Sequence, residues 1–357
     1  MGAGERPQGD REVTEAQGRA GNRERVWRQV LSHGLSSRAD VAEGLRLSKV
    51  AVTNIAAELI EAGWLTEAGL AGGYAGRPAG LLDLHPQAGT VLGVDVQRRV
   101  VTATLGDLRG DPGAVQALPL PVPDEVTGTV LELLRAAHAR PPHGPLRQVV
   151  ISVPAPVGPQ GEPEAPSGLP EFGAAAAQDW ASAHEVPLAF ENDVKLAAVA
   201  EHHAGAALGR DDFALLALRE TGVALGLFLG GRLYRGDRGR AGELSLLRWP
   251  DAGRLTPLES LDPQTRQAAL AMIVGGLAAA LDLRLLVVQG GPDTAEELIG
   301  QIRALVSGSV SIAHSAHGDA GPLRGALVLA ARLAQDGVLR AGLPAATPRE
   351  ARLNPSG

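Results

Sequence analysis

Two short stretches of the chain combine acids, an amide and glycines in a way that suits a polyol ligand. Glu191-Asn192-Asp193 follows a short apolar run, and Glu243 lies in the glycine-flanked segment Gly239–Leu244. Carboxylates and amides at a strand end can hydrogen-bond sugar hydroxyls, and an acid there can also take a proton in phosphoryl transfer. Asn192 and Glu243 would therefore suit a sugar. The alternative is that both stretches are ordinary turns and caps.

A second set of polar residues lies in the stretch Ser37–Leu65, which predicts two short helices joined by a tight turn at Gly44–Leu47. In the second helix four apolar residues recur at i, i+3, i+4 and i+7 and predict a buried stripe: Val52, Ile55, Ala56 and Leu59. The opposite face carries small polar side chains that could approach base edges in a major groove: Ser48, Lys49, Thr53 and Asn54. Ser48 can also cap the helix. The pattern favours a helix-turn-helix that reads DNA, although any amphipathic helix pair has the same periodicity.

The segments on either side support this interpretation. Arg23–His33 has helical spacing and predicts a support helix. After Leu65 come two extended runs around a glycine-rich loop, which is typical of the wing of a winged-helix domain. Arg77 lies on that loop between a glycine and a proline, from which it could enter a narrow minor groove. The alternative for Arg77 is a solvated linker residue.

The composition limits what the chain can be. It has 357 residues, which predicts two to three domains, and 45% of them are hydrophobic. A net charge of -7 argues against coating nucleic acid through bulk positive charge. There is no Cys, so disulfides and thiolate metal sites are excluded. No apolar stretch approaches about 18 residues and no signal-peptide core is present, so we expect a cytoplasmic protein with no membrane contact.

Beyond His85-Pro86 strands alternate with helices, which predicts an α/β sensor region of two lobes. Strands are expected at 90–96, 100–105, 148–153, 188–190, 213–218, 223–229, 285–289 and 309–313, with helices at 125–139 and 322–335. The predicted domains are a disordered extension (1–21), a winged helix-turn-helix (22–85), lobe 1 (86–205), lobe 2 (206–345) and a tail (346–357). The final helix could pack back on lobe 1.

In this order and spacing the motifs resemble the ROK family of bacterial repressors and sugar kinases, from about Arg23 to Gln335. The markers are the Ser37–Leu65 pair, Gly76-Arg77-Pro78, Gly93-Val94-Asp95, Val153–Val157, Glu191–Asp193, Gly239–Leu244, Gln289-Gly290-Gly291 and Gly318–Gly321. The resemblance implies an actin-like, hexokinase-like ATPase fold that binds a sugar between its lobes. It also implies that Asn192, Asp193 and Glu243 contact the sugar, with Asp193 at the position of the kinase base. Dimers or higher assemblies are implied as well.

The chain departs from the pattern of this family in four places. Where they have a glycine-rich phosphate turn, it has Asp95-Val96-Gln97-Arg98-Arg99, and the second phosphate loop looks like Glu220–Ala224 with an added carboxylate. Leu246 occupies the position of the family's zinc-binding His. The Asn that precedes the family's Leu-Pro pair is replaced by Gly168. We therefore predict no catalytic residue, no cofactor and no metal.

Together these features predict a DNA-binding transcriptional regulator of the ROK type, a repressor that is not an enzyme. Its expected partners are a double-stranded operator, a sugar or sugar-derivative effector, and its own copies in a homodimer or homotetramer. Two alternatives stay open: a ROK sugar kinase with an added DNA-binding head, and a regulator whose sensor is only a dimerisation scaffold.

Overall fold

The computed structural model describes residues 8–70, 80–219, 222–251, 253–306 and 310–340, which divide into two compact units. The first unit contains residues 1–89 with 334–357, and the second contains Thr90–Leu333. Within the described residues no helix is long and apolar enough to cross a membrane. Each unit is described by itself below.

The first unit has the order of elements of a winged helix-turn-helix. It consists of α1 (Gln8–His33), β1 (Ser36–Ser37), α2 (Arg38–Leu45), α3 (Lys49–Glu61), β2 (Leu65–Leu70) and β3 (Gly80–Leu84). The strands form an antiparallel sheet in the order β1-β3-β2. The predicted stripe of α3 is buried, and the predicted support residues Val26, Trp27, Val30 and Leu31 of α1 are buried with it. The predicted hairpin is therefore present, and Arg77 on its loop lies outside the described residues.

Local hydrogen bonds define the ends of the helix pair. Ser37 and Asp40 form a capping box at the start of α2, and Ser48 caps α3 by accepting a hydrogen bond from the Ala51 N–H at 3.1 Å. The left-handed residue that ends α2 is Arg46, with φ of 54°, whereas Gly44 lies inside the helix. Our expectation that Gly44 belongs to the turn was wrong. A Cβ there would lie 3.3 Å from the Gln29 amide nitrogen, so Gly44 allows α1 to pack closely against α2.

The N-terminal extension also differs from the expectation of disorder over residues 1–21. The helix α1 begins at Gln8, so residues 8–21 are helical rather than disordered. Glu, Ala, Gln and Arg in this segment are good helix formers, which allows a helix to extend without a continuous apolar stripe. At the other end of the unit, Asp336 accepts a hydrogen bond from Arg28 of α1 at 2.8 Å.

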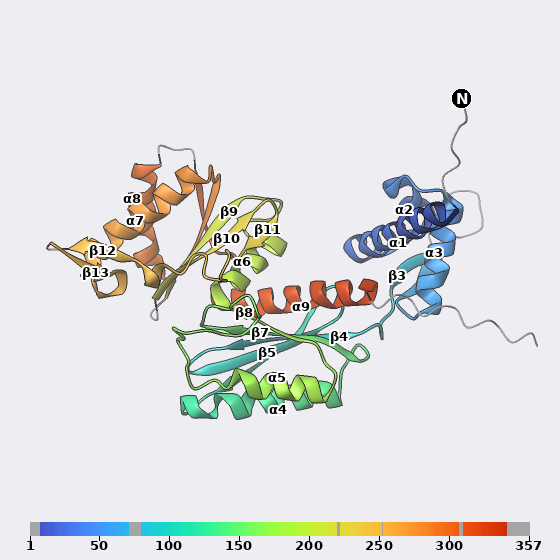
Figure 1. The fold of residues 1–357 in the computed structure, drawn as a ribbon, viewed down its shortest axis with the longest axis horizontal. Helices are drawn as coiled ribbons and strands as arrows, with labels where there is room; N and C mark the ends of the chain where they lie inside the picture. Colours follow the sequence, from blue (N-terminus) through green and yellow to red (C-terminus); the bar gives the residue numbers. More distant parts are fainter. Residues whose placement is uncertain (1–7, 71–79, 220–221, 252, 307–309, 341–357) are drawn as a thin grey trace, which may run out of the picture. The chain divides into compact units, whose positions relative to one another are not determined.

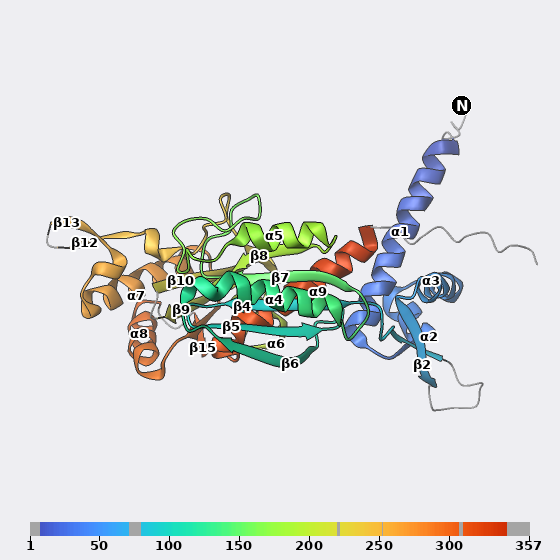
Figure 2. The same cartoon turned by 90° about the horizontal axis from the view of Figure 1, so that it is seen from below.

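The second unit is built on two five-stranded sheets. The first sheet contains β4 (Thr90–Val96), β5 (Val100–Gly106), β6 (Pro112–Pro119), β7 (Leu146–Val153) and β8 (Leu188–Asn192), in the order β6-β5-β4-β7-β8. The pairs β4–β7 and β7–β8 are parallel. Figures 1 and 2 show α4 (Val126–Ala139) and α5 (Ala174–Ala183) side by side on one face, where they enclose an apolar core. The other face is covered by α9 (Gly321–Arg340).

The second sheet contains β9 (Phe213–Arg219), β10 (Gly222–Leu229), β11 (Arg232–Tyr234), β14 (Leu285–Gln289) and β15 (Ser311–His314), in the order β11-β10-β9-β14-β15. On one face α7 (Pro263–Ala280) and α8 (Pro292–Leu305) enclose a core, and on the other face lies α6 (Asp193–Ala204). A separate hairpin consists of β12 (Arg248–Asp251) and β13 (Arg254–Pro257). Short 3₁₀ turns cover Pro123–Glu125, Leu244–Leu246, Leu258–Ser260 and Gly318–Ala320. The predicted α/β class and two-lobed fold are confirmed, and the predicted strands match to within a few residues.

Two glycines allow α9 to pack directly against its neighbours. A Cβ on Gly93 of β4 would lie 2.8 Å from the backbone nitrogen of Leu327, and one on Gly325 would lie 1.8 Å from the Leu196 carbonyl oxygen. Neither distance is compatible with a side chain, because backbone atoms cannot move aside as a flexible side chain can. The helix α9 therefore packs against both the first sheet and α6.

Candidate functional site

The first candidate surface is the exposed side of α3. Among the predicted base-contacting residues, Ser48, Lys49, Thr53 and Asn54 are all exposed. The apolar stripe of the same helix is buried in the core of the first unit. The polar residues lie on the opposite side of the helix and therefore face solvent.

Hydrogen bonds divide these four residues into two pairs. The Ser48 hydroxyl caps the helix, and the Thr53 hydroxyl donates to the Lys49 carbonyl oxygen at 2.8 Å. Neither Lys49 nor Asn54 has a side-chain hydrogen bond to another described residue, so both polar ends are available to a ligand. Val50 lies in the first turn of α3 and is 70% exposed. It was missed from the sequence because only the polar residues of this helix were considered. An apolar side chain at this place suits a thymine methyl group.

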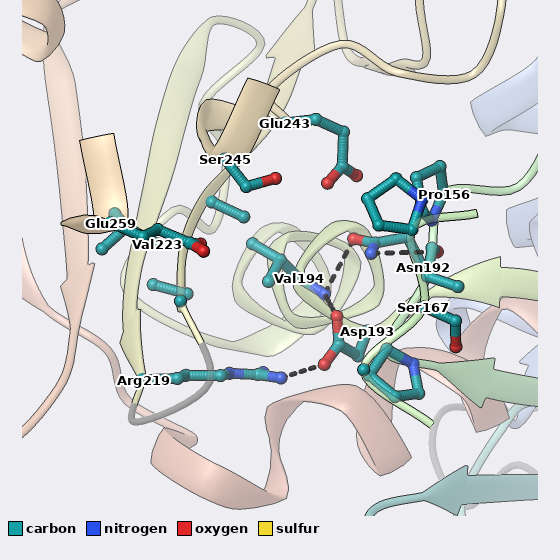
Figure 3. A pocket seen from close by; sticks show the side chains of 17 residues that line it. Pro156, Ser167, Asn192, Asp193, Val194, Arg219, Val223, Glu243, Ser245 and Glu259 are labelled. Carbon is teal, nitrogen blue, oxygen red and sulfur yellow. Dashed lines mark hydrogen bonds and ion pairs between the residues drawn. The ribbon is translucent and has the colours of Figure 1, made fainter. Parts of the chain in front are cut away.

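The second candidate site is a pocket within the second unit. Its volume is about 270 Å³, close to the lower limit for small-molecule sites. Figure 3 shows that the three predicted effector residues, Asn192, Asp193 and Glu243, line it together. The first two lie where β8 ends and α6 begins, and the third precedes a 3₁₀ turn after β11. The structure therefore brings together residues from two distant motifs, although sugar binding by them stays a prediction.

Most of the hydrogen-bonding capacity of Asn192 is used inside the protein. Its side-chain oxygen accepts from the N–H groups of Val194 and Lys195 at 3.0 and 3.1 Å, and its amide nitrogen donates to the Ala155 carbonyl oxygen at 3.2 Å. Asn192 thus caps α6 and joins it to the segment after β7. One amide hydrogen is left for a ligand.

Asp193 is ion-paired rather than open to a ligand. One carboxylate oxygen accepts from its own neighbour, the Val194 N–H, at 2.8 Å, and the other is bound by the Arg219 guanidinium. The Asp193 side chain is 7% exposed and that of Arg219 is 20% exposed. Each oxygen thus has one partner within the protein, and the ion pair with Arg219 favours the charged form of Asp193 and makes it a weaker base.

Glu243 has a buried cationic neighbour, Lys195, which sequence reasoning did not select. Lys195 is 1% exposed, its ammonium donates to the Gly239 carbonyl oxygen at 2.7 Å, and it lies 3.7 Å from the Glu243 carboxylate. Burial raises the pKa of Glu243, and the Lys195 charge offsets part of that rise. A sequence signal did exist, because Lys195 is one of only two lysines in the chain and lies in an Ala-rich helix.

Asp95 lies in β4, the first strand of the second unit, and neighbouring side chains cover its carboxylate. The Ser152 hydroxyl donates to it at 2.5 Å, and the Gln97 amide nitrogen folds back to donate at 3.1 Å. Burial raises the pKa of Asp95 to about 6, and the hydrogen bond from Ser152 offsets part of the rise. Gln97 therefore occupies space where a close approach by phosphates would require glycine.

The region in which the resemblance implies zinc does not fit that metal. Leu246 is 48% exposed, and the following segment forms the β12–β13 hairpin, from which Trp249 packs against the core of the second sheet. The chain has no Cys, and no described cluster of three or more His, Asp or Glu side chains could hold a metal ion. Further residues that line the pocket and were missed from the sequence are Arg219, Ser245 and Glu259.

Comparisons with known proteins agree with this geometry. A profile described as "ROK family" matches residues 91–254. The Escherichia coli K12 protein named "DNA-binding transcriptional dual regulator NagC" is 29% identical over 238 residues, which are 61% of this chain and 55% of that protein. The chain thus spans about half the length of the curated relatives that it matches.

Solved structures extend the likeness in fold to both units. A ROK family transcriptional regulator, described as a homologue of the E. coli MLC protein, has a TM-score of 0.70 at 17% identity, over 90% of this chain and 98% of that one. The ROK hexokinase from Thermus thermophilus has a TM-score of 0.56 at 24% identity, over 70% of this chain and all of that one. Residues 91–254 are thus a ROK family domain.

Proposed function

We propose that this protein is a DNA-binding transcriptional regulator, a repressor, whose sensor binds a sugar or related metabolite. The observation that carries the proposal is the exposed face of α3, where Lys49 and Asn54 are without partners among the described residues, in a capped helix-turn-helix. A recognition helix in a major groove uses such residues near its N-terminus. The name of the NagC relative supports the same class.

The residues of the sensor support a role in binding rather than catalysis. The kinase base position, Asp193, is ion-paired with Arg219, and the Asp95 carboxylate is covered by Gln97 and Ser152. Phosphoryl transfer needs a carboxylate that takes a proton and room for phosphates, and these contacts argue against both. We therefore propose a regulator without kinase activity, which would act on chromosomal DNA in the cytoplasm.

We further propose that the protein acts as a homodimer or homotetramer. The sensor unit leaves several large apolar side chains of lobe 2 exposed, among them Leu255 at 62% and Met272 at 58%. Exposed apolar groups of this kind favour association. Two heads on one assembly would read two half-sites of an operator, and each head alone offers few cations.

The test is selection of bound sequences from random DNA, followed by band-shift titration of the selected site. Asn54→Ala should weaken specific binding by about 1–3 kcal/mol and relax the preference at one base position. Lys49→Ala should weaken binding to selected and random DNA alike, because it removes charge. Arg254→Ala, on the exposed β13 hairpin, removes one positive charge elsewhere and should change little. Normal binding by both α3 variants would refute the assignment of α3 as the reading face.

A further inference from the structure

Val50 is an apolar residue on the exposed side of α3 that the fold by itself does not explain. Its side chain is 70% exposed, in the first turn of the helix. At such a position valine contributes little to the core of the first unit. As a β-branched residue it also favours a helix less than alanine, lysine or glutamate does. Neither packing nor helix propensity therefore accounts for valine at this place.

The position of Val50 on the helix places it beside Asn54. Residues four apart lie on the same face of a helix, and this face is opposite the buried stripe of α3. Ala57, three residues beyond Asn54, is exposed as well and carries only a methyl group, so it leaves room for a base edge. With a rise of about 1.5 Å per residue, Val50 and Asn54 are about 6 Å apart along the axis. Base pairs stack at about 3.4 Å, so the two side chains would reach base pairs one or two steps apart.

The chemistry of this face suits two A·T pairs. Ser48 and Thr53 each make a hydrogen bond within the helix, whereas Lys49 and Asn54 make no side-chain hydrogen bond to another described residue. The amide of an asparagine can bind N6 and N7 of adenine together, and an apolar side chain can contact the C5-methyl group of thymine. The Lys49 ammonium beside Val50 supplies a positive charge that suits the DNA backbone. DNA is therefore the occupant that all three side chains fit together.

On this basis we propose that Val50 determines part of the operator sequence. It contacts the methyl group of a thymine, one or two base pairs from an adenine that Asn54 reads. The inference rests on the proposed function of α3 as the reading helix and adds the base that its apolar residue selects.

The test uses the operator that the full-length protein selects from random DNA. Each thymine of one half-site is replaced in turn by uracil, which removes the methyl group and keeps the hydrogen-bonding groups of the base pair. At one position uracil should weaken binding about fourfold in a band-shift titration. This factor equals about 0.8 kcal/mol, the contribution of one buried methyl group.

Val50→Ala shortens the side chain by two methyl groups and introduces a better helix former, so α3 should fold normally. In this variant uracil at the critical position should weaken binding by less than about twofold, because the contact is already lost. Leu35→Ala is the matched control. Leu35 is also a large apolar residue of the first unit and is 55% exposed, but it lies outside α3. The Leu35 variant should keep the full effect of uracil.

The outcomes separate this inference from the proposal beneath it. Three results would each overturn the thymine contact: uracil tolerated at every position, a loss that persists in Val50→Ala, or a critical thymine more than two base pairs from the base whose preference Asn54→Ala relaxes. In each case α3 remains the reading helix if Asn54→Ala still relaxes that preference. If the full-length protein selects no sequence from random DNA, the proposed regulator is refuted and this inference with it.

Discussion

The buried Lys195–Glu243 pair offers a quantitative test of how the pocket is held together. Replacing Lys195 by Met keeps the bulk of the side chain and removes the ammonium. The change leaves the Glu243 carboxylate and the Gly239 carbonyl oxygen without their partner. Removing one member of a buried pair costs about 3–5 kcal/mol. Because the Glu243 side chain is 12% exposed and faces the pocket, water lowers the cost, and we expect a loss of about 2–4 kcal/mol.

The loss should depend on pH with a defined sign. Burial already raises the pKa of Glu243, and removing Lys195 removes a charge that lowers it. In the variant, the folded protein therefore holds the Glu243 proton to higher pH than the unfolded chain does. Stability is then greatest below the unfolded pKa of a glutamate and falls as pH rises through the folded pKa. The destabilisation of Lys195→Met should be small at pH 4 and larger at pH 8.

Urea unfolding of the full-length protein at several pH values measures the effect. The two units can unfold in separate transitions, so the transition of the first unit serves as an internal control. Adding Glu243→Gln removes the unpaired charge, and the double variant should recover at least 1 kcal/mol relative to Lys195→Met. A loss below about 0.5 kcal/mol at pH 8, or additive single effects, would refute the view that these two groups neutralise each other.

Four further predictions follow from other parts of the structure. Gly325→Ala should destabilise the second unit by more than about 2 kcal/mol, because its Cβ would meet the Leu196 carbonyl oxygen at 1.8 Å. A Cβ on Gly337 of the same helix would meet no atom within 4 Å, so Gly337→Ala should be neutral or stabilising by up to about 1 kcal/mol. Thermal unfolding compares the two variants, and equal effects would refute the close packing of α9. Burial raises the pKa of Asp95 to about 6, so the stability that its protonated form contributes is present below about pH 4 and is lost as pH rises to about 6. Asp95→Asn should flatten that part of the curve of stability against pH. An unchanged slope would contradict the raised pKa of Asp95. Arg46→Gly should stabilise the first unit by up to about 1 kcal/mol, because Arg46 adopts a left-handed conformation with φ of 54°. The midpoints of urea unfolding measure this change. A loss of stability would show that the Arg46 side chain contributes more than its strained backbone costs. The protein should show no ATP turnover with hexoses, and turnover abolished by Asp193→Asn would support the kinase alternative instead.

Much of the first unit could be predicted because its structure is locally encoded. The stripe of α3 follows from a repeat of 3.6 residues, and the cap by Ser48 follows from hydrogen bonds within one turn. Arg46 shows where such reasoning fails. A left-handed residue after a helix suggests glycine, but here Arg46 adopts that conformation, and Gly44 lies inside α2 beside the Gln29 side chain.

The pocket of the second unit was only partly predictable. The family resemblance grouped Asn192, Asp193 and Glu243 as one predicted effector site. The structure has all three along one pocket, and effector binding by them stays a prediction. Arg219 carries no motif of its own, since it ends an apolar strand directly before a predicted loop. Lys195 was visible as a rare lysine, but its partner is 48 residues away in sequence.

The sequence by itself determined the helix pair of the first unit, most strands of the two five-stranded sheets, the exposed polar side of α3 and the absence of thiolate chemistry. Each of these depends on residue type or on contacts between near neighbours. Only the tertiary structure decided that Arg219 binds Asp193, that Lys195 neutralises Glu243 and that Gln97 covers Asp95. The physical reason is that ion pairing and burial depend on which distant segments meet, and these determine whether a carboxylate is open to a ligand or already satisfied.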